Sequence, residues 1–349
     1  MLRDLLPRLG AFLQPFVATL PRQATRSHAP HYAQGLLSNL GGKNAEAIAY
    51  LHAQERQALQ KFIGQASWDD RPLLTELARQ VGQELGEPDG VLVFDPSAFP
   101  TKGTESVGVQ RQGCGRLGKI ENCQVGVSLA YVARRDHALV DVRLYLPKER
   151  AAQRKQRKKG GVPREVRFRT RHELALERLD QRASLLPPTW VAGDDEFGRC
   201  GWFRDQLRTR HERYRPAVPA NPLVRDLAAE PPPYRGRGRL PQRPFTRVER
   251  WCAALSDDAW PSGEVGAAAK GPLVVQMTKA LVQARSEGQP CDVAEWLIVF
   301  RTRQSDGTWK HDDLLSNGAL TTSDAEFARV YTAHHRVEEC FRRAKEEAG

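Results

Sequence analysis

Val-Leu-Val-Phe-Asp at residues 91–95 decides the fold, because four apolar residues in a row end on a carboxylate. A short, continuous apolar run of this kind is typical of a strand that is buried on both faces of a sheet. The segment Trp-Val-Ala-Gly-Asp at 190–194 repeats the arrangement, with Asp194 in the place of Asp95. Both aspartates are therefore expected at strand ends, where a sheet would hold them rigidly.

A third acidic residue lies on a predicted C-terminal helix that runs from about 323 to 347 without proline or glycine. At about 100° per residue, one apolar stripe of this helix would pack on the sheet. Glu338 falls at the edge of that stripe and Glu339 faces solvent, so helical geometry favours Glu338 as a ligand. Together with Asp95 and Asp194 it would form a carboxylate cluster, and such clusters bind hard divalent cations.

The composition indicates which partners such a metal site would serve. The chain has 349 residues and a formal net charge of +11, with 53 Lys and Arg against 42 Asp and Glu. A net positive charge favours the binding of polyanions. We therefore expect the metal ion to act on a phosphodiester. No apolar stretch approaches the roughly 20 residues needed to span a bilayer, and no signal peptide is indicated. Six scattered cysteines without a C-x-x-C pair predict free thiols in a reducing cytoplasm.

The order of the predicted elements indicates an α/β fold with an RNase H-like catalytic core. Residues 1–89 would form a helical N-terminal domain, a candidate for DNA binding. From residue 90 to 220 the order is strand, strand, strand, helix, strand, helix, strand. In this arrangement the first and fourth strands lie side by side, which would bring Asp95 and Asp194 together.

A β-rich insertion at residues 221–320 would interrupt this core. It opens on Pro231-Pro232-Pro233 and on Arg-Gly-Arg-Gly-Arg at 235–239, a combination that predicts neither a helix nor a central strand. Residues 321–349 would then complete the core with the helix that carries the catalytic Glu.

A basic tract runs from Arg150 to Arg171 and includes Arg-Lys-Gln-Arg-Lys-Lys at 154–159. Charge runs are often solvated loops. This one is dense and close to the proposed carboxylates, so we expect a loop that contacts phosphates. The Gly-rich stretch 106–119 is expected to be a connection. In the helix predicted at 171–186, Arg178 and Arg182 should lie off the apolar face.

Several blocks of sequence from about Tyr32 onward carry a resemblance to a known family, and four of them contain predicted site residues. They are Asp95-Pro-Ser-Ala-Phe-Pro-Thr-Lys-Gly103, Gly115-Arg-Leu-Gly-Lys-Ile-Glu-Asn-Cys-Gln124, Gly193-Asp-Asp-Glu-Phe-Gly198 and Tyr331-x2-His334-x3-Glu338-x6-Lys345. The last resembles the Y-R-E-K signature of DDE transposases from bacterial insertion sequences, with His334 in the place of the arginine. The others resemble blocks around the two aspartates of that family. Asp194 rather than Asp195 matches the second aspartate, which lies four residues before the glycine.

This resemblance implies an activity and its site. Asp95, Asp194 and Glu338 would be the catalytic triad and the ligands of two Mg²⁺ ions, with Mn²⁺ as a substitute. The reaction would be phosphodiester hydrolysis followed by strand transfer. Its partners would be double-stranded DNA, namely terminal inverted repeats and a target, bound by a homodimer in the nucleoid of a bacterial cytoplasm. No membrane is expected.

Contacts to DNA are predicted from basic residues near these blocks and from the signature helix. The residues are Lys102, Arg111, Lys119, Arg154, Lys155, Arg157, Lys158, Lys159, Tyr331, His334 and Lys345. Most would contact phosphates, which gives salt-dependent affinity with little sequence information.

Two alternatives remain open at this level. Transposases of this family continue beyond the last helix, whereas this sequence ends at Gly349, so a truncated copy that binds transposon ends and inhibits transposition is one alternative. Another RNase H-like DNA endonuclease, of a resolvase-like kind, is the second. Strand-transfer products would distinguish a transposase from both.

Overall fold

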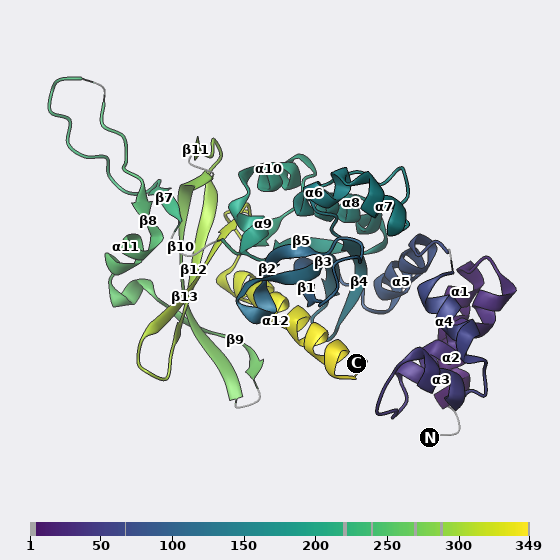
Figure 1. The fold of residues 1–349 in the computed structure, drawn as a ribbon. Coiled ribbons are helices and arrows are strands. Elements are labelled where there is room, and N and C mark those ends of the chain that lie inside the picture. The colour runs from purple at the N-terminus through teal and green to yellow at the C-terminus, as the bar shows by residue number, and fades with distance from the viewer. Residues whose placement is uncertain are drawn as a thin grey trace. The chain divides into compact units, whose positions relative to one another are not determined.

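The computed structural model describes residues 5–66, 68–218, 222–238, 240–268, 271–286 and 289–347. Within these ranges the chain is a mixed α/β protein with two β-sheets (Figure 1). It divides into two compact units, which consist of residues 1–86, 184–186 and 338–349 and of residues 87–183 and 187–337. No helix in the described ranges is long and apolar enough to cross a membrane.

The first unit is helical. Its N-terminal helices are α1 (Leu5–Thr19), α2 (Gln23–Leu36), α3 (Ala45–Leu51), α4 (Arg56–Gly64) and α5 (Arg71–Glu84). Ile48, Leu59 and Phe62 are buried together where α2, α3 and α4 meet. Asn44 fixes the start of α3, because its side chain accepts a hydrogen bond from the backbone N–H of Ala47 at 2.9 Å.

The first sheet of the second unit is built around the apolar run 91–94. Its six strands are β1 (Gly90–Pro100), β2 (Gln110–Cys114), β3 (Lys119–Val132), β4 (His137–Leu144), β5 (Pro188–Gly193) and β6 (Tyr214–Pro216). The order is β2-β3-β1-β5-β6, and β4 also pairs with β3. β1 is antiparallel to β3 and parallel to β5, and β6 is parallel to β5. Residues 91–94 have no exposed surface, which explains why their sequence does not alternate.

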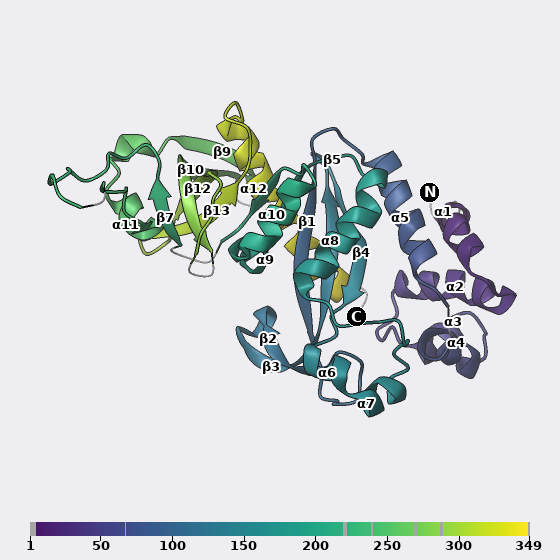
Figure 2. The ribbon, with the colours of Figure 1, turned by 90° about the horizontal axis from the view of Figure 1, so that it is seen from above.

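Helices lie over both faces of this sheet (Figure 2). The helices of this part of the chain are α6 (Lys148–Ala152), α7 (Arg154–Lys159), α8 (Arg171–Arg182), α9 (Asp195–Arg199), α10 (Gly201–Thr209) and α12 (Asp324–Glu347). On one face Phe94 of β1 contacts Phe197 of α9 and Phe203 of α10, with ring centroids 5.7 and 6.4 Å apart. On the other face Trp190 of β5 contacts Phe327 of α12 at 5.9 Å.

The second sheet belongs to the same unit and has seven strands. They are β7 (Leu223–Asp226), β8 (Thr246–Arg247), β9 (Ser262–Ala268), β10 (Gly271–Ser286), β11 (Gln289–Pro290), β12 (Glu295–Arg303) and β13 (Trp309–Ser316). The helix α11 (Val248–Ala253) packs on it through Val248 and Cys252. A bridge between Ala217 and Leu314 joins the two sheets. Between β7 and β8 the chain extends away from the sheet as a long loop (Figure 1).

Several elements differ from those that the sequence suggests. β1 continues past Asp95 to Pro100, because it stays paired with β3 over that length. The stretch 106–119, expected to be a connection, contains β2, whose pairing with β3 is not visible in its composition. The basic tract is a loop only from residue 160 to residue 170. Residues 148–152 and 154–159 form the short helices α6 and α7.

The prediction that Arg178 and Arg182 lie off the buried face of α8 was wrong. Their exposed fractions are only 4% and 3%. Asp141 of β4 explains this, because its Oδ2 accepts a hydrogen bond from Arg182 Nε at 2.8 Å and lies 3.8 Å from Arg178 Nη1. A carboxylate on a neighbouring strand allows the helix to bury two cations. The residue pattern of the helix alone could not reveal this partner, because Asp141 lies on a different element.

Candidate active site

Asp95 and Asp194 follow the last residue pair of two neighbouring strands. β1 and β5 run parallel, and the last pair in their register joins Phe94 to Gly193. Asp95 and Asp194 are the residues that follow this pair. Two acids that are far apart in the sequence therefore meet where β5 ends, as the predicted strand order requires.

Asp194 is held in place by the helix that follows it. Its Oδ1 accepts hydrogen bonds from the backbone N–H groups of Glu196 at 3.1 Å and Phe197 at 3.4 Å, so Asp194 is the N-cap of α9. Gly198 allows this helix to lie against the end of β6, because a Cβ at that position would collide with the carbonyl oxygen of Ala217. The four-residue spacing between Asp194 and Gly198 is thus a packing requirement.

The electrostatic environment of Asp194 is negative. Burial, followed by the neighbouring charges of Glu196, Asp195 and Asp95, raises the pKa of the Asp194 carboxyl to about 7. Asp95 is therefore close enough for its charge to act on Asp194. A positive charge between Asp95 and Asp194 would favour the ionised forms of both.

These two carboxylates fit a hard divalent metal ion. Mg²⁺ is usually held by one or two protein carboxylates, while substrate phosphates and water complete its coordination. The pKa of Asp194 is raised in part by the negative charges around it, and a bound cation would neutralise them. In the described part of the chain, no three His, Cys, Asp or Glu side chains are grouped so as to hold a metal. Asp95 and Asp194 would thus share the ion with the substrate, and a third protein ligand stays a prediction.

Metal binding should depend on pH through Asp194. Because its pKa in the metal-free fold is about 7, this carboxyl is mostly protonated at pH 6 and mostly ionised at pH 8. Only the ionised form binds metal, so the apparent affinity for Mg²⁺ should be about tenfold weaker at pH 6 than at pH 8. The shift in melting temperature produced by subsaturating Mg²⁺, measured against EDTA at the two pH values, tests this. Equal shifts at pH 6 and pH 8 would contradict it.

The same raised pKa sets the sign of the metal-free stability. A carboxyl whose folded pKa lies above its unfolded value of about 3.9 binds its proton more tightly in the folded state. The contribution of Asp194 to the free energy of unfolding is therefore greatest at low pH and is lost as the pH rises to about 7.

Glu338, the predicted third carboxylate, follows the fully buried Val337 on α12. The Glu338 side chain is exposed. Glu339 is the less exposed of the two acids and forms an ion pair with Arg342 at 2.6 Å, although it was expected to face solvent. Glu338 belongs to the first unit, and both aspartates belong to the second. Its membership of the site therefore stays a prediction.

Tyr331 has a packing role that the sequence did not reveal. Its side chain is only 8% exposed, and its hydroxyl donates a hydrogen bond to Asp312 Oδ2 at 2.5 Å. Its ring stacks on Phe300 of β12 with centroids 4.2 Å apart. These contacts hold α12 against the second sheet. His334 is half-buried on the same helix, and the side chain of Lys345 lies outside the described residues. DNA contacts by these three residues stay predictions.

Lys102, Arg111 and Lys119 have exposed side chains around the hairpin of β2 and β3. Lys119 forms an ion pair with Glu121 at 3.1 Å, and Arg111 donates to the carbonyl oxygen of Ile120 at 3.5 Å. Exposed pairs of this kind are weak and are easily replaced by a phosphate. Phosphate contacts by these residues stay a prediction.

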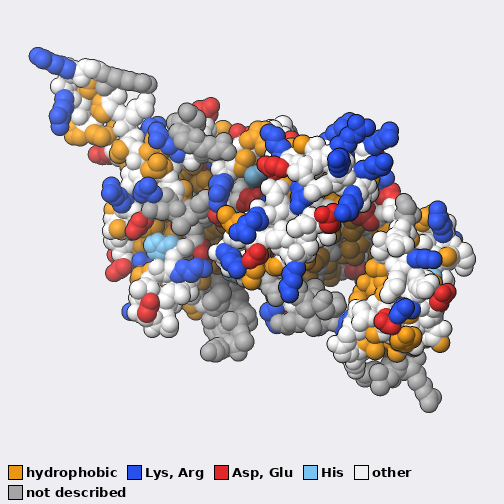
Figure 3. Space-filling model, in the orientation of Figure 1, with side chains coloured by type: hydrophobic (Ala, Val, Ile, Leu, Met, Phe, Trp, Pro, Cys, Tyr) orange, Lys and Arg blue, Asp and Glu red, His pale blue; other side chains and the backbone are white. Residues whose placement is uncertain are grey.

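The chain around α6 and α7 encloses a hollow of about 860 Å³, here called the basic hollow. Its charged lining residues are all cations, namely Arg154, Arg157, Lys158, Arg164 and Arg167. Figure 3 shows Lys and Arg side chains gathered over this part of the unit. Arg164 and Arg167 lie within the predicted phosphate-contacting tract, but they were not among the individual residues predicted to contact DNA.

Members of the basic tract differ in what they can do. Arg157 donates hydrogen bonds to three backbone carbonyl oxygens at 2.8–3.3 Å, so its guanidinium holds the wall of the hollow together. Lys159 is paired with Glu105 at 2.6 Å. Arg154, Lys155 and Lys158 are exposed and are the members best placed to bind an anion.

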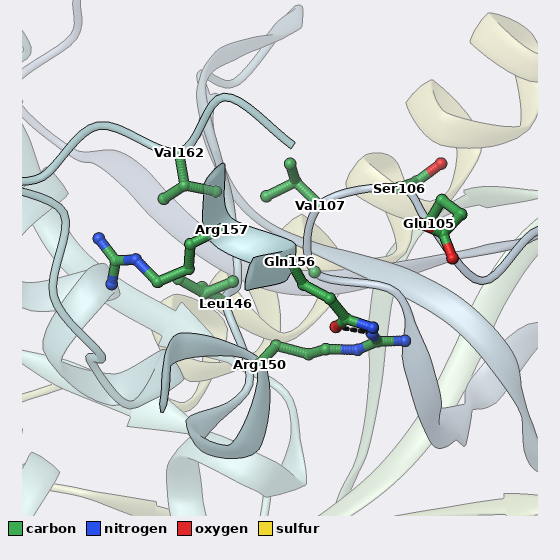
Figure 4. A pocket seen from close by; sticks show the side chains of 9 residues that line it. Glu105, Ser106, Val107, Leu146, Arg150, Gln156, Arg157 and Val162 are labelled. Atoms are coloured by element: carbon green, nitrogen blue, oxygen red, sulfur yellow. Dashed lines mark hydrogen bonds between the residues drawn. The ribbon is translucent and has the colours of Figure 1, made fainter. Parts of the chain in front are cut away.

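A small pocket marks where α6 and α7 join the loop that follows β1 (Figure 4). Arg150 donates to the carbonyl oxygens of Val109 at 2.7 Å and Thr104 at 3.1 Å, and also to the Gln156 side chain. The pocket volume of about 20 Å³ suits a single water molecule. The pocket is a structural joint, and it ties the basic helices to the strand that carries Asp95.

A protein-family model described as "DDE superfamily endonuclease" matches residues 15–265 of the chain. This range covers most of the sequence and includes both Asp95 and Asp194. No curated protein sequence matches the chain.

Proposed function

The chain belongs to the DDE superfamily of endonucleases, and from this premise we propose that it is a transposase that cuts and joins the ends of a bacterial insertion sequence. Membership of the superfamily makes DNA the substrate and a divalent metal the typical cofactor. The proposal adds the terminal inverted repeats, the strand-transfer step and Mg²⁺ as the ion.

The strand order supports an RNase H-like core. Without the short strand β2, the first sheet has the order β4-β3-β1-β5-β6, which in sequence order is third, second, first, fourth, fifth. The first three of these strands are antiparallel, and the last two are parallel to the first. In this order the first and fourth strands are neighbours, which is the feature that the proposed core requires.

The single observation that carries the proposal is the Phe94–Gly193 pair of the adjacent strands β1 and β5, because Asp95 and Asp194 are the residues that follow it. Two divalent ions, when bound, activate a water molecule for attack on a phosphodiester and stabilise the departing 3′ oxygen. Asp95 and Asp194 would hold these ions, with Glu338 as the third carboxylate. The N-cap bonds of Asp194 keep its carboxylate oriented, and the rigid sheet keeps the two acids at a constant separation.

Transposition needs more than one cut. The two ends of an element must be processed together, so we propose a homodimer on DNA. The basic hollow and the exposed cations of the β2–β3 hairpin would bind phosphates. They supply affinity, whereas recognition of the ends requires contacts to bases.

The proposal is tested with a supercoiled plasmid that carries the element's own ends, incubated with the purified protein and Mn²⁺. Wild type should release the ends and join them to target DNA with a short target duplication, and Asp95→Ala should do neither. Nicking without any joined product would overturn transposition and leave the endonuclease assignment intact.

The cations of the basic hollow are expected to contribute to DNA affinity. Arg154→Ala with Lys158→Ala should weaken binding to any duplex and reduce the slope of log affinity against log salt by about 2. The control is Arg135→Ala with Arg250→Ala, which removes two exposed arginines that do not line the hollow. Fluorescence anisotropy over a salt series measures both pairs. Equal slopes for the two double variants would show that the hollow does not bind DNA.

A further inference from the structure

The loop between β7 and β8 is a long exposed extension of the second sheet (Figure 1). We call its described residues, 227–238 and 240–245, the arm. Every side chain from 228 to 238 is exposed. Its described charged residues are three arginines, Arg235, Arg237 and Arg243, against one acid, Glu230. No role in the proposed reaction requires such an extension, so it calls for a separate explanation.

The arm is anchored at its base. Phe245 contacts the guanidinium groups of Arg225 and Arg285, which are 4.3 and 4.8 Å from its ring centroid. Arg243 donates a hydrogen bond to the carbonyl oxygen of Ala229 and so ties one limb of the arm to the other. The arm is therefore presented in a defined direction by the sheet.

The tip of the arm combines a stiff limb with a narrow turn. Three successive prolines at 231–233 fix the backbone φ angles of that limb. Gly236 and Gly238 have φ angles of +78° and +83°, a region that side chains other than glycine rarely adopt, with open space around both. Tyr234 donates a hydrogen bond to the carbonyl oxygen of Gly238 at 3.3 Å and closes the turn. The result is a thin ribbon on which arginines alternate with residues that have no side chain.

We propose that the arm enters the minor groove of A·T-rich duplex DNA and inserts Arg235 and Arg237 there. A minor groove is only about 6 Å wide, so a backbone without side chains between its arginines fits where a bulkier chain would not. A·T tracts narrow the groove further and concentrate its negative potential, which attracts inserted arginine. Guanidinium is also less strongly hydrated than the ammonium of lysine, which favours its insertion.

This inference rests on the proposed function and adds a specificity element to it. Contacts to phosphates alone would require charge, but not glycines at positive φ both between the two arginines, at Gly236, and directly after them, at Gly238. The arm would thus prefer A·T-rich sequence at or near the ends of the element. The basic hollow would supply affinity without sequence preference.

The test measures binding of the full chain in EDTA to two duplexes of equal length, one with an A-tract and one of G·C pairs. Wild type should bind the A-tract several-fold more tightly, and a minor-groove polyamide ligand should displace it. Arg235→Ala with Arg237→Ala should abolish this preference. The control is Arg247→Ala with Arg250→Ala, which removes two exposed arginines of the same sheet and its helix and should keep the preference for the A-tract.

A second variant separates shape from charge. Gly236→Ala with Gly238→Ala retains every arginine but disfavours the positive φ angles, so it should lose the A-tract preference while its salt dependence stays that of wild type. The inference is overturned if wild type shows no preference, if the glycine variant retains it, or if single-stranded RNA binds more tightly than the A-tract. The binding test needs neither metal nor cleavage. If wild type cuts DNA with Mn²⁺ but shows no preference for the A-tract, the proposed role of the arm is refuted and the proposed function is not.

Discussion

Asp194→Asn is expected to lower metal-dependent DNA cleavage by roughly a thousandfold or more and, at the same time, to stabilise the metal-free protein. Metal ions contribute several kcal/mol to such a reaction, which corresponds to a rate factor of this order. Asparagine can still cap α9, because its side-chain oxygen accepts the same bonds from Glu196 and Phe197. The substitution removes only the charge, whose repulsion by its neighbours raises the pKa of Asp194.

Two companion variants make this result interpretable. Asp194→Ala should lose cleavage too, but its melting temperature should fall, because the cap is lost at a cost of about 1 kcal/mol. Asp195→Asn alters the adjacent carboxylate, which is half-buried and paired with Arg199 at 2.8 Å, and should retain cleavage. Plasmid nicking with Mn²⁺ and thermal melting in EDTA at pH 8 provide the two measurements. If Asp194→Asn still cleaves DNA and Asp195→Asn does not, then Asp195 binds the metal and Asp194 does not.

Glu295→Leu is expected to lower the free energy of unfolding by about 3–5 kcal/mol, since it leaves a buried arginine without its counter-ion. Glu295 and Arg204 are each 1% exposed, and they are joined by bonds of 2.8 and 3.2 Å. Tyr214 also donates its hydroxyl hydrogen to Glu295. For a unit of this size the loss corresponds to a fall in melting temperature of about 10 °C.

The pair also links the candidate site to the second sheet. Arg204 lies on α10 and Glu295 on β12, and Arg204 donates another hydrogen bond to the carbonyl oxygen of Gly198 in α9, the helix capped by Asp194. A double-mutant cycle with Arg204→Met tests the coupling. The double variant should lose less free energy of unfolding than the sum of the losses in the two single variants, because it leaves no unpaired charge buried. Single variants within 1 kcal/mol of wild type would refute this role.

Much of the first sheet could be predicted from local sequence. The apolar runs before Asp95 and Asp194 are each long enough to identify a buried strand without knowledge of the rest of the chain. The order of strands and helices then restricts the topology to few choices. Strand length was harder to predict, since the extension of β1 to Pro100 depends on its pairing with β3 and not on its own residues.

Charged residues were predicted least well where their partners are distant. Arg178 and Arg182 carry the pattern of a solvent-facing helix, yet Asp141 draws them inside. The pairing of Arg204 with Glu295 joins residues far apart in the chain, and no spacing rule predicts it. Tyr331 was assigned to DNA by its motif, whereas its hydrogen bond to Asp312 emerged only from the fold.

The sequence by itself determined which segments become buried strands, because backbone hydrogen bonding and apolar burial act on neighbouring residues. It also determined that both runs end on a carboxylate. Only the tertiary structure decided that Phe94 pairs with Gly193, that the pKa of Asp194 rises to about 7, and which arginines are buried. Each of these depends on charges and strand partners brought together through space, and the order of residues along the chain does not specify those distances.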